Sequence, residues 1–271
     1  MIELVIPTFK RLDKQITLNS IPDNFRDGVT LVVQPQEVED AKKIHSNIFV
    51  LSGDNIGISE TRKQIAMEWG CSRKSRHWVL DDDLEILKSE MVDEKIQKSP
   101  VDNTTFQECL DKIEETMDNG FYHGGIGSTL VNPIGKWPFT NNSRILGNVF
   151  YDGEALAETF KEIDWILDNA EDYYVNLQLL TRGLPNRVMY EFISNPGLSN
   201  SEGGCSTSRT IERHNEACKK LAEKFPEFVS IKTKVATSGS WKGLERLGIN
   251  GRWKKAYESS QKSSLAGFFD E

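Results

Sequence analysis

Three consecutive aspartates occupy positions 81–83, directly after a short apolar run at residues 77–80 that is typical of a buried strand. Like charges this close repel one another, and a buried strand does not tolerate them. The strand must therefore end at this point. Either the turn is a solvated loop, which an acidic run by itself often is, or a cation binds there.

The spacing of these aspartates favours a metal ion. Side chains two positions apart in an extended chain point to the same side, so we expect Asp81 and Asp83 to converge while Asp82 points elsewhere. Two carboxylates with open positions suit Mn²⁺ or Mg²⁺ shared with the phosphates of a substrate. Such a metal would neutralise a diphosphate leaving group. Asp81 and Asp83 are therefore the predicted metal ligands.

The elements that position this turn alternate along the first eighty residues. Apolar runs predict strands at 4–7, 29–34, 48–51 and 77–80. Helices are predicted at 37–45 and after Ser59, which could cap a helix that ends at Gly70. Alternating strands and helices indicate parallel strands joined by crossovers, in a Rossmann-like open sheet. Ligands bind beyond the carboxyl ends of such strands, where the aspartates lie.

The pattern is looser in the second half of the chain. Residues 88–103 are polar, and we expect a loop there. Helices are predicted at 104–119, at 171–182 and from Ile211 to Pro226. Strands are predicted at 124–131, 144–151 and 187–193, and a glycine- and serine-rich loop at 195–208.

Composition limits the class of protein. The 271 residues, 38% of them hydrophobic, suffice for one large domain or for a domain with an appended lobe. No apolar run approaches the roughly 18 residues of a membrane helix, and the N-terminus lacks the pattern of a secretory signal. The four cysteines have no C-x-x-C pairing, which is typical of reduced thiols, so we expect a cytoplasmic protein with no membrane partner.

The charge of the chain is unevenly distributed. The net charge is −8, yet residues 232–262 contain eight lysines and arginines against two glutamates. Aromatic residues are interleaved with these cations, a combination that suits phosphates and stacked bases. The candidate nucleic-acid contacts are Trp241, Lys242, Arg252, Trp253, Lys254 and Lys255. The alternative is that the tryptophans close the hydrophobic core and the cations are solvated.

Several segments together resemble the GT-A fold glycosyltransferases. The opening VIPTFKR resembles their first strand, NIGISETRKQIA (55–66) their glycine-arginine segment, WVLDDDLEI their D-x-D strand, and AEDYYVNLQLLTRG (170–183) their Glu-Asp helix. The similarity covers roughly residues 1–195. With EGGCSTSR and FPEFV further along, the set is most similar to the TET-associated glycosyltransferases of bacteriophages. The Q-x-x-R-W signature of processive polysaccharide synthases is not matched.

This resemblance implies an α/β fold of the GT-A type, with a Rossmann-like mixed sheet flanked by helices and a C-terminal extension of helices and loops. Residues 1–195 would be the core, with a nucleotide-sugar half at 1–87 and an acceptor half at 88–195. Residues 196–271 would be the extension that docks DNA. The implied donor-binding residues are Pro7, Thr8, Phe9, Arg11, Gly57, Arg62, Asp81 and Asp82. For Arg62 two roles are open, holding a diphosphate or bracing an aspartate of the turn.

The resemblance also implies the chemistry. The donor would be a nucleotide-diphosphate sugar, with UDP favoured, and the acceptor a 5-hydroxymethylpyrimidine such as 5-hydroxymethylcytosine in phage DNA. An inverting enzyme needs a carboxylate to take the proton of the acceptor hydroxyl, and Asp172 is the expected base, with Glu171 and Asp164 in reserve. Carboxylates at a helix start are also favoured by the helix dipole alone.

Other functions remain open from the sequence. A GT-A enzyme of this kind could transfer sugar to a glycan, a lipid or a protein. The aspartates could instead serve a metal-dependent phosphoesterase or nuclease, which would release phosphate without any sugar donor. A nucleotide-binding module without catalysis would bind a sugar nucleotide and leave it intact.

Overall fold

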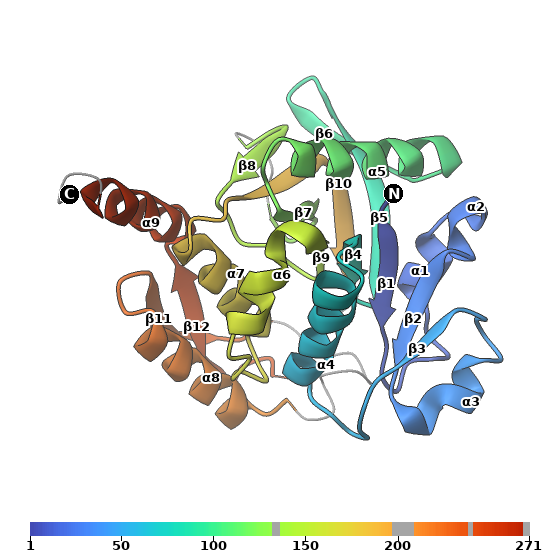
Figure 1. Ribbon diagram of the computed structural model, residues 1–271, viewed down its shortest axis with the longest axis horizontal. Coiled ribbons are helices and arrows are strands. Elements are labelled where there is room, and N and C mark those ends of the chain that lie inside the picture. Colours follow the sequence, from blue (N-terminus) through green and yellow to red (C-terminus); the bar gives the residue numbers. More distant parts are fainter. Residues whose placement is uncertain (132–135, 197–208, 238–240, 268–271) are drawn as a thin grey trace.

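A mixed sheet of ten strands forms the centre of the described part of the chain, which is residues 1–131, 136–196, 209–237 and 241–267 of a computed structural model (Figure 1). The strand order is β3-β2-β1-β4-β9-β7-β10-β5-β6, and β8 pairs with β10. The strands of this sheet are β1 (Glu3–Pro7), β2 (Val29–Val33), β3 (Ile48–Val50), β4 (Arg76–Leu80), β5 (Leu84–Val92), β6 (Lys95–Pro100), β7 (His123–Ser128), β8 (Phe139–Asn141), β9 (Asn148–Asp152) and β10 (Asn186–Pro196).

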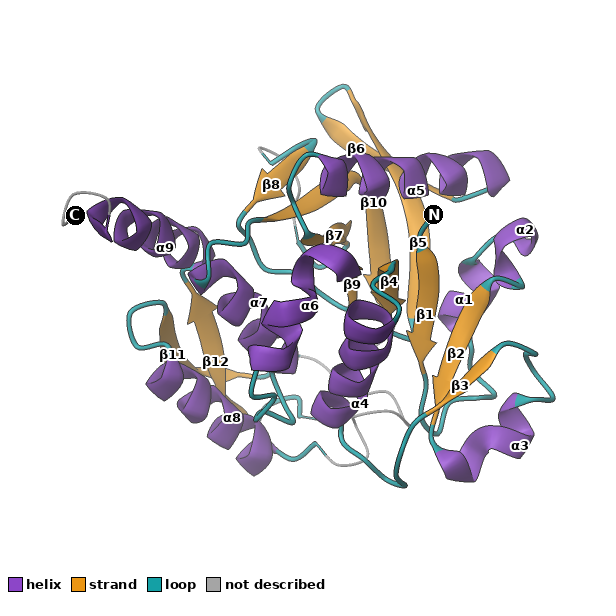
Figure 2. Cartoon of the chain, viewed as in Figure 1, coloured by secondary structure: helices purple, strands orange, loops and turns teal. Residues whose placement is uncertain are grey.

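Helices lie on both faces of this sheet (Figure 2). They are α1 (Ile16–Ser20), α2 (Asp23–Arg26), α3 (Val38–Ala41), α4 (Ile58–Ile65), α5 (Asn103–Asp118), α6 (Gly153–Glu162) and α7 (Glu171–Thr181). The later part of the chain contributes α8 (Ile211–Lys224), a hairpin of β11 (Val229–Val235) and β12 (Glu245–Gly251), and α9 (Trp253–Gly267). Among all the described residues, no helix is long and apolar enough to span a membrane.

The four predicted N-terminal strands are parallel neighbours, as expected. β1 pairs with β2 on one side and with β4 on the other, and β2 pairs with β3. Every residue of β2 is buried, because a parallel strand with helices on both faces needs a continuous apolar run. The α/β fold with a mixed, helix-flanked sheet is confirmed, since β9 then joins β4 in the antiparallel direction.

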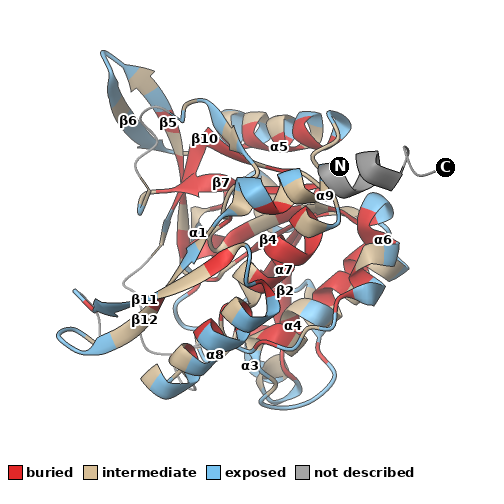
Figure 3. Cartoon of the chain, turned by 90° about the vertical axis from the view of Figure 1, so that its left-hand side faces the viewer, coloured by how far each residue is buried: buried red, intermediate tan, exposed pale blue. Residues whose placement is uncertain are grey.

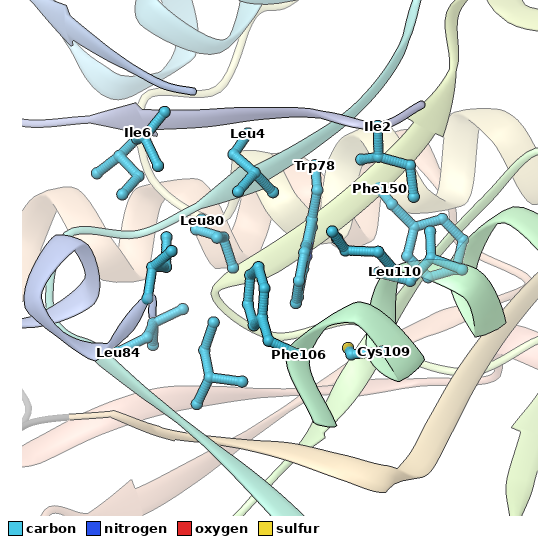
Figure 4. Close-up of a cluster of buried hydrophobic side chains, with 14 of the residues drawn as sticks. Ile2, Leu4, Ile6, Trp78, Leu80, Leu84, Phe106, Cys109, Leu110 and Phe150 are labelled. Atoms are coloured by element: carbon cyan, nitrogen blue, oxygen red, sulfur yellow. The ribbon is translucent and has the colours of Figure 1, made fainter. Parts of the chain in front are cut away.

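Alternation along β1 divides the core between the two faces of the sheet. Leu4 and Ile6 pack on one face with Trp78 of β4 and Phe106 of α5 (Figure 4). Val5 points to the opposite face, where it joins a cluster with Ile65 of α4. Both faces are therefore covered, and the polar residues that follow β1 and β4 are left at the edge of the sheet.

The loop predicted at 88–103 is wrong, because β5 and β6 form a hairpin there. β5 lies between β10 and β6, and it turns into β6 through Asp93 and Glu94, both with positive φ. β6 is an exposed edge strand, so its lysines and glutamine face water and conceal the strand pattern (Figure 3).

Two helix predictions also need correction. The helix predicted at 37–45 is shorter, since α3 spans only Val38–Ala41. Ser59 does not cap α4: Gly57 holds the cap position, while the Ser59 hydroxyl donates to the carbonyl of Trp165 at 2.9 Å. α4 also continues beyond Gly70, as a π-helical stretch, Ala66–Ser72. The remote carbonyl of Trp165 thus competes for the hydroxyl that a local cap would use.

The C-terminal elements share a core with the preceding helices. One buried cluster joins Leu156 of α6 and Leu177 of α7 with Leu221 of α8 and Ala256 of α9. The ring centroids of Tyr173 in α7 and Trp253 in α9 are 5.3 Å apart. The division at residue 195 remains a prediction. Of the loop predicted at 195–208, the first two residues belong to β10, and residues 197–208, with most of the EGGCSTSR motif, lie outside the described residues.

Candidate active site

A cleft of about 900 Å³ opens at the carboxyl ends of β1 and β4. Parallel pairing aligns Leu4 with Trp78 and Val5 with Val79, so the residues that follow the two strands meet at one edge of the sheet. Of the residues predicted to bind the donor or the metal, the following line the cleft: Pro7, Thr8, Phe9, Arg11, Gly57, Asp81, Asp82 and Asp83. A cleft at this edge is where an open α/β sheet binds its ligands.

The aspartate in the middle of the turn is held by the loop that follows β1. The Thr8 hydroxyl donates to Asp82 at 2.8 Å, and the side-chain amide of Gln15 donates to Thr8 at 2.9 Å. Arg11 donates through Nη1 to Asp82 and to Asp83, at 2.9 Å each. Asp82 is buried, and its pKa is raised chiefly by burial, against the opposing effect of Arg11. The first loop therefore braces the turn from one side.

Arg62 braces the turn from the other side. Its guanidinium forms an ion pair with Asp81, the second of the two roles expected for it. Asp81 also donates its backbone N–H to the carbonyl of Gly147 at 2.8 Å. Partial removal from water raises the pKa of Asp81 to about 6, although the charge of Arg62 opposes this shift. The remaining 38% of the side chain is exposed. Because its surroundings disfavour the charged form, a further cation beside Asp81 would stabilise the carboxylate.

The donor set fits a divalent metal that takes its other ligands from substrate or water. All three aspartates line the cleft. Both carboxylate oxygens of Asp82 accept hydrogen bonds, one from Thr8 and one from Arg11, whereas Arg62 pairs with one oxygen of Asp81 and Arg11 with one oxygen of Asp83. Within the described ranges, no group of three or more histidine, cysteine, aspartate or glutamate side chains could hold a metal ion. Carboxylate oxygens are typical ligands of Mg²⁺ and Mn²⁺, which also bind the phosphate oxygens of a substrate. Zn²⁺ sites more often use histidine or cysteine ligands.

The predicted base and its neighbour start α7, beside the cleft and not among the residues that line it. Asp172 lies 3.6 Å from Arg144, whose guanidinium stacks on Tyr173 at 4.0 Å. Burial and the charge of Asp172 raise the pKa of Glu171 well above that of a free glutamate, while Arg62 opposes them. Arg62 therefore acts electrostatically on Asp81 of the turn and on Glu171 of α7.

Asp164, the other reserve base, is held by a hydrogen bond and an ion pair. It accepts a hydrogen bond from the Tyr174 hydroxyl and lies 3.1 Å from the ammonium of Lys224. These contacts join the loop before α7 to α7 and α8. It is not among the cleft-lining residues.

The cleft contains functional groups that the sequence analysis missed. Asp168 lies against Gly57, where a Cβ would come 2.5 Å from its carboxylate. Arg209 and two cations of α8, Arg213 and Lys220, also line the cleft. The only signal in the sequence is the spacing of 213, 217 and 220, which marks one face of a helix without saying what that face meets.

The predicted DNA contacts lie in the C-terminal elements and outside the cleft lining. Trp253 is half-buried against Tyr173, and Trp241 packs on His214 with ring centroids 5.6 Å apart. Lys255 lies 3.4 Å from the carbonyl of Glu227. Arg252, Lys242 and Lys254 are exposed. The tryptophans thus pack on protein, while the cations face solvent, where DNA contact remains a prediction.

Comparison with known proteins gives both a family and individual relatives. The family model described as TET-Associated Glycosyltransferase matches residues 2–195. The chain is 29% identical over 243 residues to the Beta-glucosyl-HMC-alpha-glucosyl-transferase of Enterobacteria phage T2, which covers 86% of this chain and 84% of the relative. It is 28% identical over 241 residues to the protein of the same name in Enterobacteria phage T6, with the same coverage. Among solved structures, UDP-glucose pyrophosphorylase complexed with UDP-glucose matches 83% of this chain and 100% of its own, at 10% identity and a TM-score of 0.43.

Proposed function

The chain belongs to the TET-associated glycosyltransferase family, and from this premise we propose that it transfers a glucosyl group from a nucleotide-diphosphate sugar to a hydroxymethylated pyrimidine in phage DNA. Support for a glucosyl donor and a modified-base acceptor comes from the names of the T2 and T6 relatives. The same names describe an acceptor that already carries a β-glucosyl group, so glucosylated HMC is the acceptor to test first. UDP is the nucleotide we favour.

The observation that carries this proposal is the acidic turn in the cleft. Asp81 and Asp83 face the same cleft as Thr8 and Arg11, at the edge of the sheet where ligands bind. We propose that Asp81 and Asp83 hold Mn²⁺ or Mg²⁺. When bound, the metal would neutralise the diphosphate as it leaves.

The side chains around the turn would orient the reactants. Arg11 and Arg62 fix the carboxylates before any ligand arrives, which lowers the cost of forming the site. The loop of Pro7, Thr8 and Phe9 lines the cleft at the end of β1 and would receive the nucleoside. We assign the acceptor side to the α7 end of the site, where Asp172 would take the proton from the attacking hydroxyl.

The anomeric outcome tests the role of Asp172. The resemblance to the GT-A glycosyltransferases makes us favour an inverting enzyme over a retaining one. An inverting enzyme requires a base that takes the proton of the acceptor hydroxyl. The relatives' names, however, describe an α-glucosyl product, and an α-linked donor would give that product with retention. Nuclear magnetic resonance of the product's anomeric proton decides between the two. Retention of the anomeric configuration would exclude Asp172 as the base, but it would not contradict the proposed glucosyl transfer.

Mass spectrometry of DNA after incubation tests the proposal as a whole. Oligonucleotides with unmodified, hydroxymethylated and glucosylated cytosine would be incubated with a panel of sugar nucleotides, with Mn²⁺ or with a chelator. We expect the mass of one hexose on a modified base, from one donor, and only with metal. Transfer to a glycan, lipid or protein but not to DNA would contradict the acceptor. Phosphate release or DNA cleavage without any sugar donor would instead support the phosphoesterase alternative.

A further inference from the structure

α8 forms a wall of the cleft, and that wall is cationic. The cleft-lining residues from this region are Arg209, Arg213, Glu216, Ala217 and Lys220. Only Glu216 among them is acidic, and Lys220 pairs with it at 2.8 Å. The wall therefore retains positive charge, in a chain whose net charge is −8.

The orientation of this wall is set by the adjacent, buried face of α8. His214 and Leu221 are buried, and the carbonyl of Leu247 in β12 lies 2.8 Å from Nε2 of His214. Asn215 accepts the backbone N–H of Leu247, also at 2.8 Å. Positions 213 and 220 each precede one of these buried residues by one position, so they lie about 100° around the helix from the buried face and line the cleft. The cations therefore face the cleft because the adjacent face of the helix is packed against protein.

The remainder of the cleft has the opposite charge. Asp81, Asp82 and Asp83 lie at the strand ends, and Asp168 lies beside Gly57. An anionic ligand would be repelled by this acidic side unless cations offset it. In addition, Nε of Arg209 is buried and has no hydrogen-bond partner in the described part of the chain. A buried donor without a partner costs free energy, and an acceptor oxygen of a ligand in the cleft would offset that cost.

We propose that Arg209, Arg213 and Lys220 bind a phosphate group of the ligand that occupies the cleft. Guanidinium groups suit this role because they donate two parallel hydrogen bonds to phosphate oxygens. The inference deepens the proposed function and rests on it for its two sources of phosphate, the diphosphate of the sugar nucleotide and the backbone of the DNA acceptor. A cleft of about 900 Å³ is large enough for a nucleotide sugar.

Calorimetric titration with UDP, pyrophosphate and a modified single-stranded oligonucleotide, each with Mn²⁺ present, separates the sources. The variants are Arg213→Gln, whose side chain is exposed, and the double variant Arg209→Gln with Arg213→Gln. Lys219→Gln is the matched control, since Lys219 is an exposed cation of the same helix that does not line the cleft. Thermal unfolding of every variant establishes that the fold is retained.

The two sources predict different results. If the wall holds the diphosphate, UDP and pyrophosphate affinity falls about tenfold or more in the double variant, while DNA affinity keeps its value. If the wall holds the backbone of the acceptor, DNA affinity falls instead. The slope of log affinity against log salt concentration then becomes shallower, by about 0.7 for each lost contact. Affinities for all three probes equal to those of Lys219→Gln would overturn the proposal, and so would a wild type that binds none of them. These tests measure binding and do not require glucosyl transfer. A protein that binds phosphate through the wall but glycosylates nothing would therefore refute the proposed function and leave this inference standing.

Discussion

The acidic turn and the basic C-terminal segment, residues 232–262, carry opposite charges and are held in opposite ways. In the turn, Arg11 contacts Asp82 and Asp83, and Arg62 contacts Asp81. In the basic segment, the side chain of Lys254 is 79% exposed and pairs with Glu258 at the long distance of 3.9 Å. Charges that converge and are partly buried can position a small ligand. Dispersed and solvated charges act mainly through their summed field on a polyanion.

This comparison assigns different tasks to the two regions. Neutralising one carboxylate near the cleft should affect a single step strongly, because each occupies one place in a shared geometry. Neutralising cations of the basic segment should affect DNA affinity gradually and in proportion to their number. The following predictions test that difference.

The largest effect is expected from Asp172→Asn. If Asp172 takes the proton of the acceptor hydroxyl, turnover should fall about a hundredfold or more while donor affinity is nearly preserved, because a base acts in the chemical step. Asp164→Asn is the matched control. Because Asp164 contacts Tyr174 and Lys224 and does not line the cleft, this variant should retain most of the turnover. Steady-state kinetics and donor titration measure both quantities. Near-normal turnover in Asp172→Asn would rule out this base.

Asp83→Asn should abolish the metal-dependent part of donor binding, about a tenfold or larger loss of affinity. Asp82 keeps its bonds to Thr8 and Arg11 in this variant, so the turn should stay folded. Titration of the donor with and without Mn²⁺ makes the measurement, and a thermal melt checks the fold. The same gain from Mn²⁺ in variant and wild type would remove Asp83 from the metal site.

Replacing Arg252, Lys254 and Lys255 with alanine should weaken DNA binding without affecting the donor. The plot of log affinity against log salt should become shallower by about 0.9 for each lost duplex contact, or about 0.7 for each single-stranded one. All three side chains are exposed, so the fold should tolerate the change. Equal DNA affinity and parallel salt plots would mean that the segment is merely solvated, and DNA would then have to dock elsewhere.

The smallest effect concerns pH. The pKa of Glu171 is raised in the folded protein by burial and by Asp172, so the folded state binds this proton more tightly than the unfolded chain does. Its contribution to stability is therefore complete below the ordinary glutamate pKa of about 4.3 and is lost as pH rises through the raised pKa. Relative to Glu171→Gln, the wild type should lose about 1 kcal/mol or less per pH unit in that window. Urea unfolding at several pH values measures this, and parallel profiles would contradict it.

Local sequence determined the strands and the place of the acidic turn. The runs at 4–7, 29–34 and 77–80 reveal buried parallel strands, because alternating side chains on a sheet covered on both faces must all be apolar. A charged residue cannot continue such a strand, so Asp81 had to mark its end. Where exposure removed that requirement, as in β6, the local pattern failed and the hairpin was missed.

Only the tertiary structure decided which distant groups meet. Arg11 reaches Asp82 and Asp83 across some seventy residues, and Asp168 approaches Gly57 from a loop that has no sequence pattern of its own. The spacing of Arg213 and Lys220 identifies a helix face. That this face is turned to the cleft depends on His214 packing against β12, more than thirty residues further along the chain. Helix and strand periods follow from backbone geometry within a few residues, whereas convergence in a site is set by long-range packing, which a local pattern does not contain.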